Sequence, residues 1–263
     1  MRKLVVLFVG VFILSCSNEK EQKTNFVQED TIELAQPRVI ASSRIIDSSV
    51  VIKADLKMEG IIIRYTENEE EPTEKSKIYK NQLEISKAGN YNFKAFHSDW
   101  KQSSTTSLKV FEGGILPPVF SWKTIASKSY PGQGAQTLIN NKLGGLNFKD
   151  SQWMGFDTTA VAVIDFKIPK RISKLSVSYL VDTKSWIFPP ENVSVIVNQK
   201  DTISVNIPKL PEGKYKQLDA VVIPIDREIE TLKINVVNTI LPSWHPSNGN
   251  NAWLFMDEWI FNE

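Results

Sequence analysis

Two short aromatic segments carry the residue types best suited to hold a sugar. Residues 185–188 read Ser-Trp-Ile-Phe, and residues 243–248 read Ser-Trp-His-Pro-Ser-Asn. Sugars present apolar C–H faces, so an aromatic ring offers a flat platform while nearby polar groups bond the hydroxyls. The candidate ligand-binding residues are therefore Trp186, Phe188, Trp244, His245 and Asn248. The alternative is that these rings only pack their loops, because proline-bracketed motifs often fix the shape of a loop.

The adjacent carboxylates Asp257 and Glu258 are the residues that could perform acid–base chemistry. A glycosidase typically needs two carboxylates that flank the scissile bond. Here the pair lies within a strand candidate at residues 253–261, where alternation would send the two side chains to opposite faces. We therefore expect no catalytic residue and no enzymatic activity.

Composition excludes several classes of function. The 263 residues carry a net charge of +1 and form no basic stripe that would favour nucleic acid. Two histidines and one cysteine leave few soft ligands for zinc. The sequence also has no Gly-x-Ser-x-Gly, no phosphate-binding Gly-Lys-Thr loop and no His-Glu-x-x-His.

The N-terminus has the features of an exported, lipid-anchored protein. A basic start precedes an apolar run at residues 4–14, which is far shorter than the ~20 residues of a membrane-spanning helix. Residues 13–16, Ile-Leu-Ser-Cys, resemble a bacterial lipobox, which implies a signal peptide at 1–15 and lipidation of Cys16. The alternative is an incidental cysteine beside an ordinary signal-peptidase site. With no other cysteine, the exported protein forms no internal disulfide.

A polar tether at residues 16–29 follows the leader. Its mixture of charges resembles the export signals that send Bacteroidetes lipoproteins to the outer cell surface. We therefore expect a lipid anchor in the outer membrane and a protein that faces the exterior. A plain flexible linker explains the same residues equally well.

The rest of the chain predicts an all-β protein with two β-sandwich domains. In residues 30–112, short β-branched or alternating runs are separated by polar turns, as in a small antiparallel sandwich. Alternation predicts these inward-facing side chains: Ile63, Tyr65, Tyr91, Phe93 and Ala95. Residues 113–118 read Gly-Gly-Ile-Leu-Pro-Pro and are predicted to be a hinge.

A second domain is predicted at residues 119–263. Strand candidates at 160–166, 172–180, 192–198, 201–207, 219–225, 232–237 and 253–261 are separated by loops rich in Pro, Gly and Asn. No segment has a long 3.6-residue apolar period, so a jelly-roll sandwich is expected. Six of the seven tryptophans fall in this domain.

The first domain resembles the immunoglobulin-like domain that follows the catalytic part of chitobiases and β-N-acetylhexosaminidases. The matching pieces are a strand ending Arg-Tyr-Thr at 64–66, an acidic turn ending Pro-Thr at 72–73, and Phe-Lys-Ala at 93–95. The resemblance implies a spacer or packing module.

The second domain resembles the discoidin-like domains, which include family 32 carbohydrate-binding modules and the closing domain of bacterial family-20 glycoside hydrolases. The matching segments are 138–145, 153–156, 163–166, 186–190 and 242–258. The resemblance implies an accessory module. In family-20 enzymes an adjacent Asp-Glu pair works inside a barrel, for which this chain has no room.

The resemblance also raises the question of a structural calcium ion. The first long loop of this family usually reads Leu-x-Asp-Gly, and its Asp often helps to hold calcium. Here Asn140 stands in that position, while Glu258 matches the usual second carboxylate. At most one calcium is expected, with Asn140 and Glu258 as ligands. The alternative is that Asn140 bonds its own loop without a metal.

Together these features predict a non-catalytic surface lipoprotein that binds a glycan, of N-acetylhexosamine-containing or galactose type, through its second domain. The competing hypothesis is a docking lipoprotein of a glycan-utilisation system, which holds a partner protein and no sugar. A large apolar patch would favour docking. A small groove ringed by polar groups would favour sugar.

Overall fold

The computed structural model describes residues 32–263. The predicted signal peptide, most of the tether and the lipidation site Cys16 lie outside these residues. Within the described part, the protein is all-β, with two short 3₁₀ turns, η2 (Ala135–Ile139) and η3 (Thr183–Ser185). No helical segment among residues 32–263 is long and apolar enough to cross a membrane.

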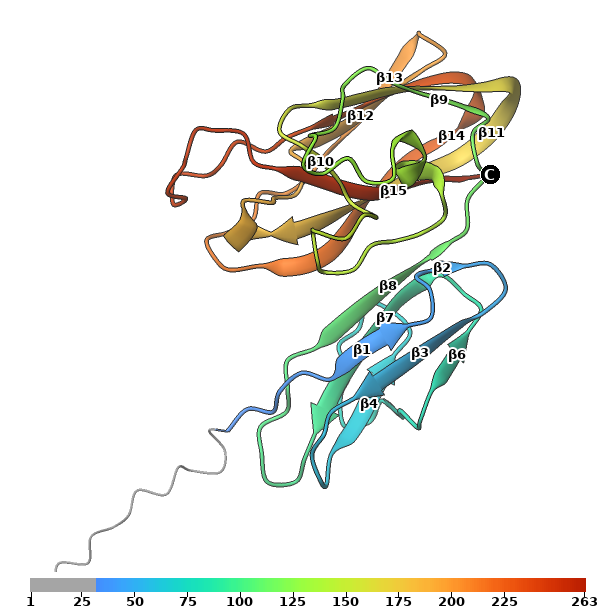
Figure 1. The fold of residues 1–263 in the computed structure, drawn as a ribbon. Coiled ribbons are helices and arrows are strands. Elements are labelled where there is room, and N and C mark those ends of the chain that lie inside the picture. The colour runs from blue at the N-terminus through green and yellow to red at the C-terminus, as the bar shows by residue number, and fades with distance from the viewer. Residues whose placement is uncertain (1–31) are drawn as a thin grey trace, which may run out of the picture.

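Strands β1–β8 form two sheets that pack face to face, which we call the N-terminal module (Figure 1). One sheet has the order β1-β3-β6, from β1 (Arg38–Ala41), β3 (Val50–Asp55) and β6 (Leu83–Ile85). The other has the order β2-β8-β7-β4-β5, from β2 (Ile45–Ile46), β8 (Thr106–Glu112), β7 (Gly89–Phe96), β4 (Ile62–Thr66) and β5 (Lys77–Ile78).

The core of the N-terminal module forms where the apolar sides of these sheets meet. Ile52 from β3 and Phe93 from β7 are fully buried there, and Tyr65 stacks on Phe93 with ring centroids 5.9 Å apart. The inward prediction is confirmed for Tyr91, Phe93 and Ala95, which are all buried. Ile63 and Tyr65 are half-buried and pack against the same cluster. Period-two alternation therefore located this core correctly.

Strands β9–β15 form a seven-stranded sheet, which we call the C-terminal module. Its order is β10-β15-β11-β14-β12-β13, with β9 paired to β11. The strands are β9 (Val119–Trp122), β10 (Met154–Phe156), β11 (Ala160–Asp182), β12 (Asn192–Val197), β13 (Asp201–Asn206), β14 (Lys216–Val237) and β15 (Leu254–Asn262).

The two longest strands build both layers of the C-terminal module. β11 and β14 pair antiparallel along their lengths, with register irregularities between Asp165 and Lys170 and between Ile172 and Lys174. The first half of β11 pairs with β9, and its second half pairs with β15. The sequence predicted two separate strands in each of these segments. That prediction was wrong because bulges bend a strand without ending it.

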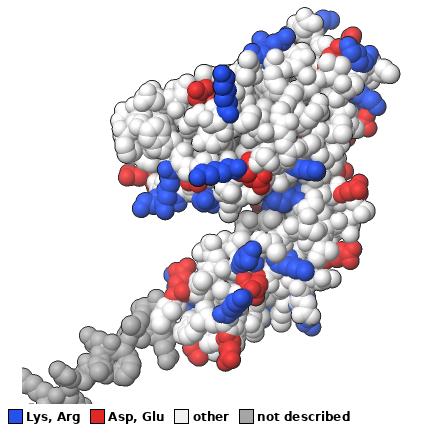
Figure 2. Space-filling view, viewed as in Figure 1, with Lys and Arg blue, Asp and Glu red and all other residues white. Residues whose placement is uncertain are grey.

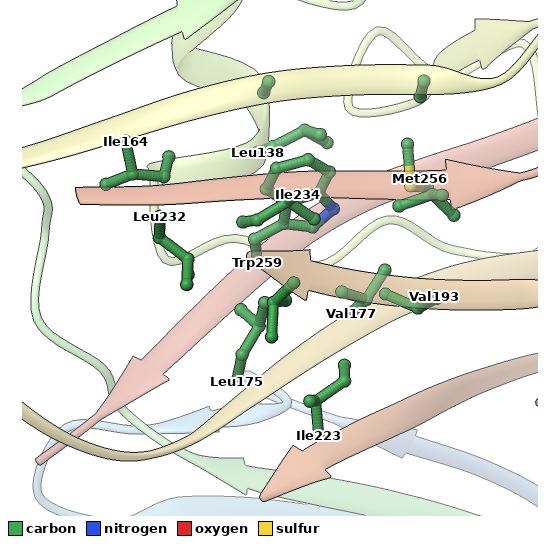
Figure 3. Close-up of a cluster of buried hydrophobic side chains, with 14 of the residues drawn as sticks. Leu138, Ile164, Leu175, Val177, Val193, Ile223, Leu232, Ile234, Met256 and Trp259 are labelled. Atoms are coloured by element: carbon green, nitrogen blue, oxygen red, sulfur yellow. The ribbon is translucent and has the colours of Figure 1, made fainter. Parts of the chain in front are cut away.

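The core lies between these two layers. Side chains from both halves of the paired strands β11 and β14 meet there, including Ile164 and Leu175 from β11 and Ile223 and Ile234 from β14. Trp259 from β15 lies in their midst with 1 % of its surface exposed (Figure 3). Alternate residues of each layer are apolar. The β11–β14 pair therefore folds back on itself, so that the apolar side chains of the two layers are buried against one another.

The two modules touch directly. Ile45 and Phe111 from the N-terminal module and Ile260 from β15 form one buried cluster. The connecting segment is also tied down, since Ile115 N donates to Phe261 O at 2.8 Å. The C-terminus therefore lies at the junction between the modules (Figure 1). Beside this contact, a groove of about 840 Å³ is lined by residues of both modules, and Figure 2 shows the notch.

Candidate functional site

An aromatic pocket of about 280 Å³ lies at one end of the C-terminal module. Aromatic side chains dominate its wall, with Lys184 and Ser185 as the polar contributions. The complete lining is Tyr130, Phe148, Lys184, Ser185, Trp186, Ile187, Trp253 and Phe255. Mostly apolar walls with a few polar groups are typical of small-molecule sites. Of the predicted ligand-binding residues, Trp186 alone lines this pocket.

Trp186 is held in an unusual backbone conformation. It caps η3 with φ 64° and ψ 20°, in the left-handed region that a bulky residue seldom adopts. Its N–H donates to Thr183 O at 3.3 Å, and its side chain remains 45 % exposed. Such a conformation costs on the order of 1 kcal/mol and persists where the surroundings enforce it, often at a functional site.

Hydrogen bonds to the neighbouring chain hold Trp186 in place. Trp253 N donates to Trp186 O at 2.8 Å, and Phe188 N donates to Trp253 O at 3.2 Å. Ile187 also exchanges backbone hydrogen bonds with Asp182. The pocket therefore sits on a paired backbone rather than on a free loop tip.

The rest of the wall comes from aromatics that pack edge to face. The Tyr130 ring lies 4.8 Å from Phe255, 5.4 Å from Trp253 and 6.1 Å from Phe148, measured between centroids. Tyr130, Phe148 and Trp253 are half-buried, so each keeps a face free of the core. Trp253 lies at the start of the predicted strand 253–261 and was not among the predicted ligand-binding residues. Tyr130 and Phe148 were missed because each stands alone in a loop.

The second predicted segment lies beneath and beside Trp186. His245 is 4 % exposed, and its ring meets the Trp186 ring edge to face at 5.4 Å. Phe188 is 3 % exposed and packs against both Trp244 and His245. Phe188 and His245 are therefore covered in this structure and support the exposed ring of Trp186.

Trp244 and Asn248 occupy the outer part of this loop. Trp244 is half-buried against Phe188, with ring centroids 5.9 Å apart. Asn248 is exposed, and its side-chain amide donates to His245 O at 3.4 Å. Neither residue lines the pocket. Of the five predicted ligand-binding residues, four therefore form one cluster of rings, namely Trp186, Phe188, Trp244 and His245. Asn248 lies at the rim of this cluster.

The carboxylates Asp257 and Glu258 are buried, with 0 % and 1 % of their surfaces exposed, and neither lines this pocket. The register of β15 slips between Met256 and Glu258, so Asp257 is an extra residue in the ladder. Asp257 Oδ2 accepts from Gly144 N, and Glu258 Oε2 accepts from Asn140 N. Both carboxylates therefore face the same loop, and the predicted alternation to opposite faces was wrong.

Burial changes the acidity of this pair. It raises the pKa of Glu258 to about 8 and that of Asp257 to about 6, because desolvation disfavours the charged forms. Hydrogen bonds from the backbone N–H groups of residues 140–142 act in the opposite direction on Glu258.

The residues present do not fit the calcium ion that the resemblance implied. Among the described residues, no group of three or more His, Cys, Asp or Glu side chains could hold a metal. Glu258 Oε2 faces the N–H groups of Asn140 and Lys142, at 3.1 and 3.3 Å. Positive N–H ends favour the carboxylate and disfavour a cation. Asn140 Oδ1 is likewise engaged, since it accepts from Lys142 N at 2.9 Å and from Gln152 Nε2 at 3.1 Å.

Comparison with solved structures finds carbohydrate-binding modules, at low sequence identity and low TM-score. One is CpGH89CBM32-4 of Clostridium perfringens in complex with GlcNAc-α-1,4-galactose, at 13% identity and TM-score 0.32, covering 55% of this chain and 88% of that one. A Streptococcus pneumoniae fucose binding module shows 10% identity and TM-score 0.34, with 56% and 95% covered. The family 32 module of C. perfringens NanJ with galactose shows 9% identity and TM-score 0.31, with 54% and 91% covered.

The sequence itself matches one known family over part of its length. No curated protein matches the chain. The resemblance predicted for the first domain is confirmed, since residues 45–107, within the N-terminal module, match the chitobiase/β-hexosaminidase C-terminal domain family.

Proposed function

We propose that the C-terminal module binds a carbohydrate in the aromatic pocket beside Trp186 and performs no chemistry on it. The observation that carries the proposal is the lining itself. Five aromatic side chains meet around about 280 Å³, with an ammonium and a hydroxyl group among them. Aromatic faces suit sugar C–H groups, and Lys184 and Ser185 supply donors for hydroxyl oxygens.

The dimensions favour a short ligand. Pockets for drug-sized molecules usually span about 300–1,000 Å³, so this pocket suits a single sugar unit at the end or side of a glycan. Trp186 stands 45 % exposed beside it and can extend the contact to a neighbouring unit. N-acetylhexosamine and galactose are the sugars we would test first.

The absence of chemistry belongs to the same proposal. The adjacent carboxylates are buried beneath the loop of residues 140–144 and do not line the pocket. A glycosidase acid and its partner must both reach the scissile bond. Asp257 and Glu258 reach backbone N–H groups instead.

The cellular setting is also part of the proposal. The leader at residues 1–15 and Cys16 support a lipid anchor in the outer membrane, with the protein facing the exterior. The N-terminal module would then act as a spacer that carries the pocket away from the membrane. The buried contact between Phe111 and Ile260 supports this role, because it holds the two modules together.

The test is a glycan array probed with the full chain, beside the Trp186→Ala and Trp100→Ala variants. Trp100 lies in the N-terminal module and stacks on His97, so it controls for the loss of an indole ring. We expect wild type and Trp100→Ala to bind the same glycans and Trp186→Ala to lose them. A silent array with folded wild-type protein would overturn the proposal and favour the docking hypothesis. Equal binding by all three proteins would place the site elsewhere.

A further inference from the structure

The side-chain amide of Gln152 lies at a point where four oxygen atoms converge. Its Nε2 atom is 3.0 Å from Lys142 O, 3.1 Å from Asn140 Oδ1, 3.3 Å from Thr137 O and 3.4 Å from Asp257 O. Gln152 itself is only 6 % exposed. Three segments of the module, namely η2, the following loop and β15, thus meet around one nitrogen.

The number of oxygen acceptors around this nitrogen exceeds the number of N–H groups that an amide can donate. A carboxamide nitrogen carries two N–H donors, yet four acceptors surround it here. An oxygen atom in the same place would face four other oxygens, so the nitrogen must occupy it. Convergence of several carbonyl and amide oxygens on one point is the environment that a hard cation prefers.

A second contact fixes the orientation of the amide. Asn140 Nδ2 donates to Gln152 Oε1 at 3.3 Å, while Gln152 Nε2 donates back to Asn140 Oδ1. This reciprocal pairing requires an amide at position 140, because a carboxylate there could not donate. The same pairing gives Gln152 Oε1 a partner within a buried site, where an unsatisfied acceptor is costly.

We propose that the carboxamide of Gln152 stands in for a cation, so that the loop of residues 137–144 folds without metal, and that removing this amide exposes a latent calcium site. Four neutral oxygens would then remain around the vacated point. Calcium takes six to eight oxygens at about 2.3–2.6 Å, so small inward shifts and bound water would complete the shell.

The test compares the thermal stability of the full chain with and without calcium. Wild type should show the same Tm in EDTA and in about 5 mM calcium, a concentration above the roughly 0.1–1 mM dissociation constants of extracellular calcium modules. Gln152→Ala should melt roughly 5 °C lower in EDTA, because the buried oxygens around Nε2 lose the two N–H donors that they share. Calcium should restore at least half of that loss, whereas magnesium should not, since it demands tighter octahedral geometry.

Gln133→Ala is the matched control, because Gln133 lies just before η2 with its side chain exposed. It should leave Tm unchanged with or without calcium. A calcium-dependent Tm in wild type, or stoichiometric calcium binding to wild type in a calorimetric titration, would overturn the proposal without requiring any variant to fold. A Gln152→Ala protein that folds but ignores calcium would overturn its second half.

Discussion

The backbone of Trp253 donates a hydrogen bond to the carbonyl oxygen of Trp186 at 2.8 Å, and this bond joins the two walls of the aromatic pocket. The bond joins two segments that are far apart in the sequence. One directly follows η3, and the other directly precedes β15. This bond explains how Trp186 can hold a left-handed conformation and still present an exposed ring. The pocket is therefore formed before any ligand arrives, which limits the entropy lost on binding.

The ring of Tyr130 should contribute to binding by its face rather than by its hydroxyl group. Tyr130 contacts Phe148, Trp253 and Phe255, and keeps part of its surface free. Tyr130→Phe should keep the affinity within about twofold, while Tyr130→Ala should weaken it about tenfold, a loss of about 1.4 kcal/mol. Titration calorimetry on the best array glycan measures both. Equal losses in the two variants would mean that the hydroxyl group carries the contact.

Trp244 should matter more for the stability of its loop than for direct contact with the ligand. It packs on Phe188 but does not line the pocket. Trp244→Ala should lower stability by about 1–2 kcal/mol, and Tm by a few degrees, because it removes half-buried aromatic surface. Differential scanning calorimetry gives the shift. A loss of binding as large as that of Trp186→Ala, at unchanged Tm, would instead assign Trp244 to the ligand.

Glu258 should make the C-terminal module less stable as pH rises. Burial raises its pKa from the ordinary value of 4.5 to about 8, so the folded state holds the proton more tightly than the unfolded state. That stabilisation is complete below about pH 4.5 and is lost as pH rises toward 8.

Glu258→Gln isolates this contribution, because the amide keeps an acceptor oxygen and cannot titrate. Asp257, whose pKa is raised to about 6, is present in both proteins, and its charge adds to the rise in the pKa of Glu258. The difference in Tm between wild type and variant should therefore shift in favour of the variant between pH 5 and 8, a window set by the same two values, about 4.5 and 8. A constant difference across that range would show that Glu258 keeps its ordinary acidity.

Phe111 should couple the two modules. It is 6 % exposed and lies with Ile45 and Ile260 in the buried cluster at the junction. Phe111→Ala should remove about 3 kcal/mol of packing and separate the melting transitions of the two modules, whereas Phe111→Leu should behave nearly as wild type. Calorimetry resolves the transitions, and small-angle scattering reports the change in shape. A single unshifted transition in Phe111→Ala would show that the contact contributes little.

Most of the strands could be predicted because alternation is a local property. β12 alternates half-buried and buried residues along its whole length, as its sequence indicates. The short strands β9 and β10 escaped prediction, since three or four residues carry too little pattern. The continuity of β11 was also hidden, because its exposed middle residues look like a turn when the partner strand is unknown.

The site was predicted in part. Trp186 could be recognised because it stands among polar residues before two prolines. Tyr130 and Phe148 join it only through long-range folding, which no local motif reports. Gln152 gave no signal at all, since its role depends on oxygens from three distant segments.

The most direct test of the account is a calorimetric titration of wild type, Trp186→Ala and Trp100→Ala with one array-selected oligosaccharide. Wild type and Trp100→Ala should bind with equal affinity, and Trp186→Ala should bind at least about 30-fold more weakly, the loss expected when about 2 kcal/mol of aromatic contact is removed. Equal affinity in a folded Trp186→Ala would contradict the assignment of the pocket as the sugar site.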